Sequence, residues 1–235
     1  MNRQLIIAID GPSGVGKSTL SRRLAQQLRY VNIDTGAMYR CVALAAHRAG
    51  LAADDEKSLQ ALCADMEIRF VRKDGTEKVL LNGEDVSEAI RTPEISLLSS
   101  RVSAQPTVRQ CMLGLQRQMG EQGGVVLEGR DIGTVVFPSA EVKFFLAATA
   151  RERGKRRYLE LKAKGMDVDL DQTIAEVEAR DAADSGRLHA PLRQAEDAVL
   201  IDTTCMNIDQ VLERMLQVVA ERQQVCDPSK EGAAS

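Results

Sequence analysis

Residues 11–18 read Gly-Pro-Ser-Gly-Val-Gly-Lys-Ser and match the pattern G-x-x-x-x-G-K-[ST] at every defined position. The run before them, from Gln4 to Ile9, is short, continuous and rich in isoleucine, as is typical of a buried strand. After them, from Lys17 to Leu28, leucine recurs every fourth residue and predicts the apolar face of a helix. A strand, a glycine-rich turn and a helix in this order predict the first unit of a parallel-sheet domain.

The glycine-rich turn has the chemistry of a phosphate cradle. Its glycines let backbone N–H groups approach phosphate oxygens, and the helix that follows directs its N-terminal dipole toward the anion. Lys17 can bridge the β- and γ-phosphates, and the Ser18 hydroxyl can ligate Mg²⁺. A glycine-rich turn without a ligand is the alternative, but the strand and helix on either side favour a nucleoside triphosphate. The predicted ATP-binding residues of the turn are Gly11, Pro12, Ser13, Gly14, Val15, Gly16, Lys17, Ser18 and Thr19.

The rest of the chain alternates predicted strands and helices, which indicates a parallel sheet with helices on both faces. Further strands are predicted at 30–33, 125–128, 142–146 and 198–202, and helices at about 37–48, 55–65, 93–104, 107–121, 150–164, 171–183 and 208–219. One stretch differs, because residues 67–72 alternate with period two, residues 73–76 are a hairpin signal, and a second predicted strand at 77–81 is followed by the turn dipeptide Asn82-Gly83. We interpret this stretch as an antiparallel insert in the α/β fold.

Composition excludes several classes of protein. The 235 residues carry 31 Lys and Arg against 34 Asp and Glu, and the net charge of −3 argues against a general nucleic-acid binder. Aromatic residues make up only 3%, with no Trp, so stacking platforms are not expected. Five cysteines without a CxxC pair, and two distant histidines, predict neither a zinc site nor a disulfide framework. No signal peptide or membrane-length apolar run is present, and we expect a cytoplasmic protein.

Arginine-containing motifs indicate the second substrate. They are Asp34-Thr-Gly-Ala-Met-Tyr-Arg40, Gly129-Arg-Asp-Ile-Gly-Thr134 and Arg180-Asp-Ala-Ala-Asp-Ser-Gly-Arg187. Because ligands of α/β proteins bind at the carboxyl ends of strands, and arginine binds phosphate with two N–H groups, these motifs favour phosphoryl transfer to a second phosphate. A surface salt bridge is the alternative for any single arginine. The basic run from Arg151 to Arg157 is either a solvated helix face or a lid over ATP, and we favour the lid, with Arg157 at the nucleotide.

Other proteins with this turn fit less well. No Asn-Lys-x-Asp guanine-reading motif is present, which argues against a GTPase. A mechanical ATPase would have a hydrophobic strand ending in Asp-Glu. The strand 125–128 instead ends in Glu128, which could lie in the second coordination shell of Mg²⁺, and the following Gly-Arg-Asp suits substrate binding.

The chain resembles the bacterial cytidylate kinases over about residues 4–220. The matching stretches, in order and at similar spacings, are GPSGVGKST, DTGAMYR, NGEDVSEAIRTPEIS, GRDIGTVVFPSAEVKFFLAA and RDAADSGRLHAPL. The resemblance implies an α/β P-loop kinase fold: a five-stranded parallel sheet flanked by helices, a helical lid and a small antiparallel β insert in the monophosphate-binding region. It also implies transfer of the γ-phosphoryl of ATP to CMP or dCMP with Mg²⁺, in pyrimidine nucleotide metabolism, by a monomer that binds neither nucleic acid nor membrane.

The resemblance also implies residue roles. The residues implied to bind CMP are Thr35, Arg40, Ser100, Arg109, Arg130, Asp131, Arg180 and Asp184, and those implied to be catalytic are Lys17, Arg130 and Arg187. Among them Arg40 and Arg130 would contact the CMP phosphate, Ser100, Arg109 and Asp131 the cytosine edge, and Arg180 and Asp184 the ribose. Thr35 keeps a hydroxyl where relatives can carry Ser. Ser100 by itself is an ordinary helix-surface hydroxyl.

Hydrogen-bond chemistry partly supports the base-reading roles. Cytosine offers an amino donor and the acceptors N3 and O2. Asp131 can accept from the amino group and Arg109 can donate to N3 or O2. Uracil would place a carbonyl against the carboxylate and is expected to be disfavoured.

We expect six regions along the chain. They are a core segment with the P-loop at 1–34, a monophosphate-binding region at 35–121 with the insert at about 63–91, core at 122–149, a lid at 150–187, core at 188–222 and a frayed tail at 223–235. Three alternatives remain open on the residues alone. They are another P-loop kinase of the shikimate or uridylate type, a nucleotide-sensing module without turnover, and a nucleic-acid binder acting through residues 151–157.

Overall fold

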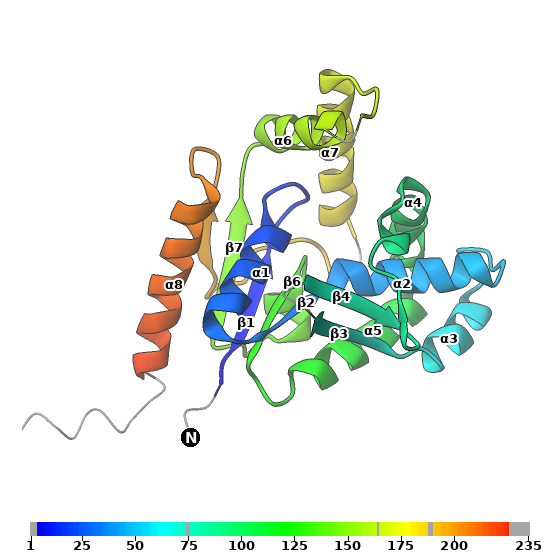
Figure 1. The fold of residues 1–235 in the computed structure, drawn as a ribbon, viewed down its shortest axis with the longest axis horizontal. Coiled ribbons are helices and arrows are strands. Elements are labelled where there is room, and N and C mark those ends of the chain that lie inside the picture. Colours follow the sequence, from blue (N-terminus) through cyan, green and yellow to red (C-terminus); the bar gives the residue numbers. More distant parts are fainter. Residues whose placement is uncertain (1–3, 74–75, 164, 188–189, 226–235) are drawn as a thin grey trace, which may run out of the picture. The chain divides into compact units, whose positions relative to one another are not determined.

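The computed structural model describes residues 4–73, 76–163, 165–187 and 190–225 (Figure 1). The chain forms two compact units, one made of residues 1–32 with 122–235 and the other of residues 33–121. The predicted turn residues Asp74 and Gly75, His189, and residues 226–235 of the predicted tail lie outside the described residues. Within the described part of the chain, no helix has the length and apolarity needed to cross a membrane.

The main sheet has five strands in the order β2-β6-β1-β7-β8. Their bounds are β1 Ile6–Asp10, β2 Val31–Asp34, β6 Val125–Gly129, β7 Val142–Ala147 and β8 Val199–Asp202. The strand β1 is central and pairs in parallel with β6 and β7, and β7 pairs in parallel with β8. A central strand is buried on both faces, which explains its continuous apolar sequence. Because the strands are parallel, the loops after β1 and β6 leave the sheet at the same edge.

The helices α1 (Lys17–Leu28) and α8 (Ile208–Val225) pack against each other on one face of this sheet (Figure 1). The core between them contains Leu20 and Leu24 of α1, Phe144 of β7 and Met215 of α8, all at most 1% exposed. The predicted leucine stripe of α1 therefore faces the core. Burial of these side chains fixes α1, and with it the turn that precedes Lys17.

The helices α6 (Ala150–Ala163) and α7 (Leu170–Ser185) form a hairpin in the same unit (Figure 1). Gly154 lies at their closest approach, because a Cβ atom there would be 2.5 Å from Cγ1 and 2.9 Å from Cα of Ile174. Only glycine permits this spacing. The close approach locks the two helices to each other, so the hairpin is a defined element rather than two loose helices.

The second unit combines four α-helices with the antiparallel insert. The helices are α2 Thr35–Arg48, α3 Glu56–Ala64, α4 Pro93–Val102 and α5 Pro106–Gly120, with a short 3₁₀ helix η1 at Ala89–Arg91. The insert is a sheet of β3 Ile68–Lys73, β4 Thr76–Leu81 and β5 Glu84–Asp85. Asn82 and Gly83 have φ of 50° and 84°, as a tight hairpin turn requires, so the predicted turn is confirmed.

Most predicted elements are confirmed within two or three residues. Three features were not predicted: the short strand β5, the 3₁₀ helix η1 and a π-helical turn, η2 (Ile132–Val136). Two helices also extend further than expected, because α2 begins at Thr35 and α8 continues to Val225. The fold class predicted from the resemblance is confirmed by the five-stranded sheet, the α6–α7 hairpin and the antiparallel insert.

Candidate active site

Lys17 is the first residue of α1 and is folded back onto the loop that precedes it. Its Nζ donates hydrogen bonds to the carbonyls of Gly11, at 2.8 Å, and Pro12, at 2.7 Å. Gly11 has φ of +148°, and a Cβ atom there would lie 2.3 Å from the carbonyl oxygen of Leu146. The loop can therefore follow this path only with glycine at position 11, and the path brings the ammonium group to the loop's own carbonyls.

Burial lowers the pKa of Lys17 to about 7, and the positive charge of Arg130 adds to the effect. Glu128, Asp10 and Asp184 act in the opposite direction but do not compensate. The buried Lys17 side chain is thus acted on by charges of both signs. Its ammonium form is poorly stabilised until an anion reaches it.

A single buried carboxylate forms ion pairs with two of the predicted site arginines. Asp184 of α7, with its side chain 4% exposed, accepts from Arg130 Nε at 2.7 Å and pairs with Arg187 Nη2 at 2.7 Å. Burial raises the pKa of Asp184, but Arg130, Arg187 and Arg180 outweigh burial and hold this pKa below its usual range. The carboxylate is therefore ionised, and it orients the two guanidinium groups.

Asp10 holds the loop that carries Arg130 and Asp131. Its Oδ1 accepts from the backbone N–H of Ile132 at 2.9 Å, and its Oδ2 accepts from that of Gly133 at 2.7 Å. Burial raises the pKa of Asp10 to about 6, the two amides lower it, and Asp131 raises it further. This carboxylate and its loop contact were not predicted from the sequence.

The second unit holds the other predicted acceptor-site residues. Asp34 caps α2 by accepting from Ala37 N–H at 2.8 Å, and its second oxygen accepts from Arg40 Nη2 at 3.0 Å. The Arg40 Nε is buried without a hydrogen-bond partner. The Arg109 guanidinium lies 5.9 Å from the centre of the Tyr39 ring. Thr35 is buried beside Asp34, and Ser100 is exposed on α4.

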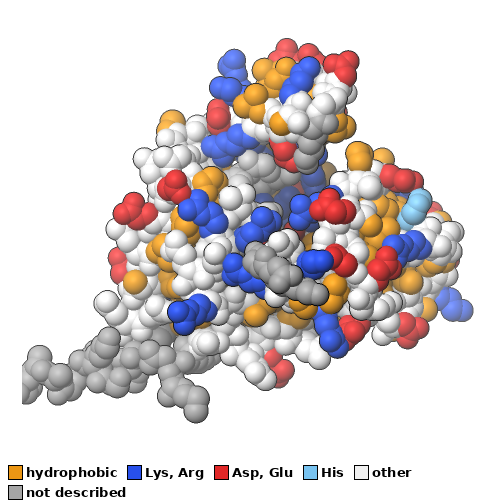
Figure 2. Space-filling view, viewed as in Figure 1, with side chains coloured by type: hydrophobic (Ala, Val, Ile, Leu, Met, Phe, Trp, Pro, Cys, Tyr) orange, Lys and Arg blue, Asp and Glu red, His pale blue; other side chains and the backbone are white. Residues whose placement is uncertain are grey.

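The basic run on α6 divides into residues with different surroundings. Arg153 is 4% exposed and donates to the carbonyls of Ser13 and Ala148, both at 2.9 Å, and it also pairs with Asp181 of α7. Arg157 is exposed and pairs with Glu160 at 3.0 Å. On the surface of the α6–α7 hairpin, basic, acidic and apolar side chains are mixed (Figure 2). The run is therefore not a uniform basic face, and Arg153 links the hairpin to the glycine-rich loop.

The cytidylate kinase family model matches residues 7–221. The chain belongs to the cytidylate kinase family. It is a nucleoside monophosphate kinase, a phosphotransferase, and the family predicted from the sequence motifs is confirmed.

Similar members of this family come from several bacteria. The chain is 63% identical to a cytidylate kinase of Geobacter sulfurreducens over 221 residues, 94% of this chain and 95% of that protein. It is 48% identical to one of Caldicellulosiruptor bescii, over 92% of this chain and 96% of that protein. A gluconokinase from Sinorhizobium meliloti is 12% identical and similar in fold, with a TM-score of 0.50 over 95% of this chain and 96% of that chain.

The kinase offers oxygen donors of the type that Mg²⁺ prefers. The hydroxyl of Ser18 is exposed in the first turn of α1, next to Lys17. The carboxylate of Glu128 is 4% exposed at the end of β6 and acts electrostatically on Lys17. Mg²⁺ binds oxygen ligands and usually takes one or two from the protein and the rest from phosphates and water. A hydroxyl next to Lys17 in the chain and a carboxylate that acts on Lys17 electrostatically fit this requirement.

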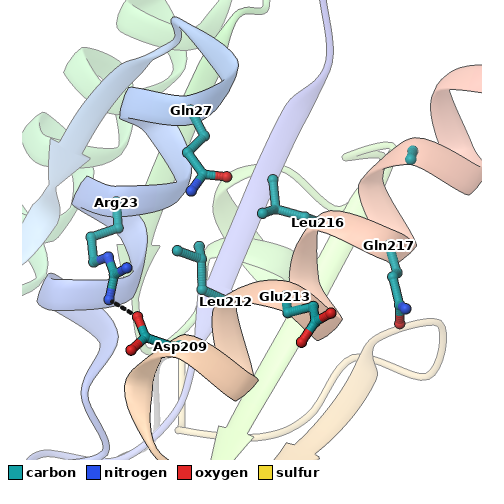
Figure 3. A pocket seen from close by; sticks show the side chains of 8 residues that line it. Arg23, Gln27, Asp209, Leu212, Glu213, Leu216 and Gln217 are labelled. Carbon is teal, nitrogen blue, oxygen red and sulfur yellow. Dashed lines mark ion pairs between the residues drawn. The ribbon is translucent and has the colours of Figure 1, made fainter.

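A groove of about 490 Å³ between α1 and α8 lies outside this site (Figure 3). Arg23 of α1 and Asp209 of α8 form an ion pair at 2.7 Å on its wall, and Leu212 and Leu216 line it. None of its lining residues belongs to the glycine-rich loop or to the arginine motifs.

The structure thus brings together part of the predicted site. Lys17, Arg130, Asp184 and Arg187 interact within one unit, and Arg180 acts on Asp184 from a distance. Thr35, Arg40, Ser100 and Arg109 belong to the other unit. Sequence reasoning missed Asp10 and the pair of Arg153 with Asp181. For Asp10, the signal in the sequence was a carboxylate at the end of the first strand. For Arg153 and Asp181, it was two opposite charges 28 residues apart on consecutive helices.

Proposed function

We propose that the kinase transfers the γ-phosphoryl group of ATP to CMP or dCMP in the presence of Mg²⁺. The observation that carries this proposal is the joint arrangement of Lys17, Arg130 and Arg187 around Asp184, next to the glycine-rich loop. The phosphoryl donor ATP and the acceptor CMP both carry phosphate, and the phosphoryl group transferred between them is negatively charged. A site with three cations and an ordered carboxylate suits that charge distribution.

The reaction is an in-line transfer that needs no general base, because the acceptor phosphate is already an anionic nucleophile. Lys17 and the two arginines neutralise the charge that develops on the transferred group. Asp184 holds the arginines in place before the substrate arrives, so little side-chain ordering remains at the moment of binding. Ser18, with Glu128 nearby, would hold Mg²⁺, which would supply positive charge to the phosphates.

The acceptor is proposed to be selected by its base. Asp131 accepts from the cytosine amino group, and Arg109 donates to N3 or O2. Ser100, exposed on α4, adds a hydroxyl to this edge. Arg40 contacts the acceptor phosphate, and its buried Nε supports this role because a buried donor without a partner is costly unless a ligand binds it.

The remaining assignments concern sugar and lid. Arg180 and Asp184 bind the ribose, and Thr35 contributes a hydroxyl at the start of α2. Residues 150–187 act as a lid and residues 35–121 as the monophosphate-binding region. Arg157, exposed on α6, is proposed to approach bound ATP. Closure over the phosphates excludes water, which would otherwise hydrolyse ATP.

Steady-state kinetics with an acceptor panel tests the proposal. ADP release is measured with ATP, Mg²⁺ and each of CMP, dCMP, UMP, AMP and shikimate. We expect turnover with CMP and dCMP, and kcat/KM for the other acceptors lower by about 100-fold or more. Preferred use of shikimate or UMP would support another P-loop kinase, and ATP binding without turnover would support a sensing module.

A Lys17→Ala variant is the catalytic control. Loss of the ammonium group that donates to the Gly11 and Pro12 carbonyls is expected to lower kcat by about 1,000-fold or more. A kcat within about threefold of the wild type would contradict the charge-neutralisation scheme.

A further inference from the structure

Asp10 is a buried carboxylate, and both of its oxygens bind the same distant loop. It is the last residue of β1 and is 4% exposed. The amides that it binds belong to Ile132 and Gly133, which are 122 and 123 residues further along the chain. The two hydrogen bonds, at 2.9 and 2.7 Å, use one oxygen each, so the carboxylate fixes the loop at two points.

The strand register explains why these groups meet. In the parallel pair of β1 and β6, Asp10 lies opposite Gly129. The residues after Gly129, which are Arg130 and Asp131, therefore turn across the end of β1 directly above Asp10. In the other direction along the chain, Asp10 is followed by Gly11, where the glycine-rich loop begins. The Asp10 carboxylate thus lies between the glycine-rich loop, which is proposed to bind ATP, and the loop of Arg130 and Asp131, which is proposed to bind CMP.

Stability does not explain the charge on this residue. Burial raises the pKa of Asp10 to about 6, and the charge of Asp131 acts in the same direction, although the amides and Lys17 oppose them. The folded protein at neutral pH therefore holds an ionised carboxylate at a cost to its free energy of unfolding. Such costs are typical of residues that serve the site rather than the fold.

We propose that Asp10 is a positioning residue for phosphoryl transfer, which holds the Ile132 and Gly133 amides and thereby fixes Arg130 relative to Lys17. The proposal rests on the proposed function, in which Arg130 contacts the acceptor phosphate. Two N–H donors converge on this side chain. A carboxylate can accept from both, whereas an asparagine amide has one accepting oxygen and would turn an NH₂ group toward the second donor.

The first test compares Asp10→Asn with Asp55→Asn. Asp55 is a partly exposed carboxylate that accepts from the backbone N–H of Ser58 at 3.1 Å and caps α3, so the control removes a similar hydrogen bond elsewhere. For Asp10→Asn we expect kcat to fall by about 10- to 100-fold, because the arginine loop moves relative to the donor. The Kd for ATP is expected to change by less than about threefold, and Asp55→Asn to leave all constants within about twofold.

The second test uses amide hydrogen exchange and needs no substrate. In Asp10→Asn, the amides of Ile132 and Gly133 are expected to exchange about tenfold or more faster than in the wild type, while Phe144 of β7 keeps its protection. This result is independent of turnover. If the wild type fails to phosphorylate CMP, the proposed function is wrong, and the exchange data still decide whether the carboxylate holds the loop.

Gly133→Ala approaches the same contact from the loop. A Cβ atom there would lie 3.1 Å from Lys143 Cδ and at contact distance, 3.4 Å, from Asp10 Oδ2, so alanine crowds this contact by a few tenths of an ångström. We expect a smaller loss of kcat than in Asp10→Asn, again with a smaller change in ATP affinity. The proposal is overturned if kcat of Asp10→Asn stays within about twofold of wild type. It is also overturned if ATP affinity falls as far as kcat, or if this variant loses its cooperative unfolding transition, since Asp10 would then serve the fold.

Discussion

At the scale of single residues, the site is dominated by ionisable groups that burial has moved away from their ordinary behaviour. Lys17 is the clearest case, because its ammonium group donates to two loop carbonyls and is acted on by the positive charge of Arg130. A triphosphate would add several negative charges at this position. The ligand should therefore stabilise the protonated lysine and raise its pKa.

The first prediction concerns the proton taken up with ATP. With a pKa of about 7 in the free protein, Lys17 is mostly neutral at about pH 8, and binding of ATP must protonate it. We expect an uptake of about 0.9 proton at about pH 8, where ATP itself is fully ionised, and an affinity that falls by up to about tenfold per pH unit above about 7. Calorimetric titration in two buffers of different ionisation enthalpy measures the uptake. An equal uptake in Lys17→Met would contradict this origin.

The second prediction concerns base selection by Asp131. Its replacement by alanine removes an acceptor for the cytosine amino group, so kcat/KM for CMP is expected to fall about tenfold more than that for UMP. Asp131→Asn can instead donate to the uracil carbonyl and is expected to raise the use of UMP relative to CMP. The measurement is the ratio of kcat/KM for CMP to kcat/KM for UMP. An effect of the substitution that acts through Asp10 would change both values alike and so would leave this ratio unchanged. Equal losses for CMP and UMP would rule out this role.

The sequence identifies a functional residue when the pattern that marks it lies within a few adjacent residues. Lys17 and Ser18 belong to a contiguous motif, and Arg130 and Arg187 lie in loops with glycine and aspartate neighbours. Ser100 has no local signal, since an exposed hydroxyl on α4 looks like any other, and only the family resemblance suggested it. Asp10 acquires its role through amides 122 residues away, which no local pattern contains.

At the scale of elements, those set by adjacent residues were predicted from the sequence, and those set by tertiary contacts were not. The strand β1, helix α1 and the Asn82-Gly83 turn follow from apolar periodicity and from backbone preferences of a few adjacent residues. The π-helical turn η2 consists of Ile-Gly-Thr-Val-Val, whose β-branched residues favour a strand. It forms instead because Asp10 accepts the first two amides of the segment, so a tertiary contact overrides local propensity.

The third prediction tests the packing of the α6–α7 hairpin. Gly154→Ala would place a Cβ atom 2.5 Å from Ile174 Cγ1 and 2.9 Å from its Cα, so the helices must separate. We expect destabilisation by about 1–3 kcal/mol and faster proteolysis within residues 150–185. The matched control is Gly114→Ala in α5, where nothing lies within 4 Å of the added atom.

The two alanine variants should move in opposite directions. Alanine is the better helix former, so Gly114→Ala is expected to stabilise the protein by about 0.5–1 kcal/mol. Thermal unfolding gives both values. If Gly154→Ala were stabilised like the control, the close approach of α6 and α7 would not limit the hairpin. Because Arg153 joins this hairpin to the Ser13 carbonyl, we also expect a lower kcat in Gly154→Ala alone.

At the scale of the whole molecule, a net charge of −3 conceals a concentrated group of cations. The chain is acidic overall, yet Lys17, Arg130 and Arg187 share one buried neighbourhood in the first unit. The negative charges of Asp10 and Asp184 offset part of this positive charge at Lys17 but do not compensate for burial. A small nucleotide can therefore be bound through backbone N–H groups and cations, without the aromatic platforms that the composition excludes.

The final prediction is that this arrangement makes the free energy of unfolding depend on pH in a specific direction. Burial lowers the pKa of Lys17 to about 7, whereas a solvated lysine in the unfolded chain keeps a value near 10.5. Between these values the unfolded chain binds more protons than the folded protein, so stability rises with pH, by at most about 1.4 kcal/mol per unit. Below about pH 7 the folded protein carries the full cost of the buried ammonium.

Lys17→Met removes this contribution and isolates it. The variant is expected to be more stable than the wild type at about pH 6, and this advantage should shrink steadily between about pH 7 and about pH 9. Denaturant unfolding at each pH measures the difference. The control is Lys57→Met, at an exposed residue of α3. Its difference from the wild type in free energy of unfolding should not change with pH in this way. A constant advantage of Lys17→Met across this range would mean that the buried lysine stays charged, and the proton uptake predicted for ATP binding would fail with it.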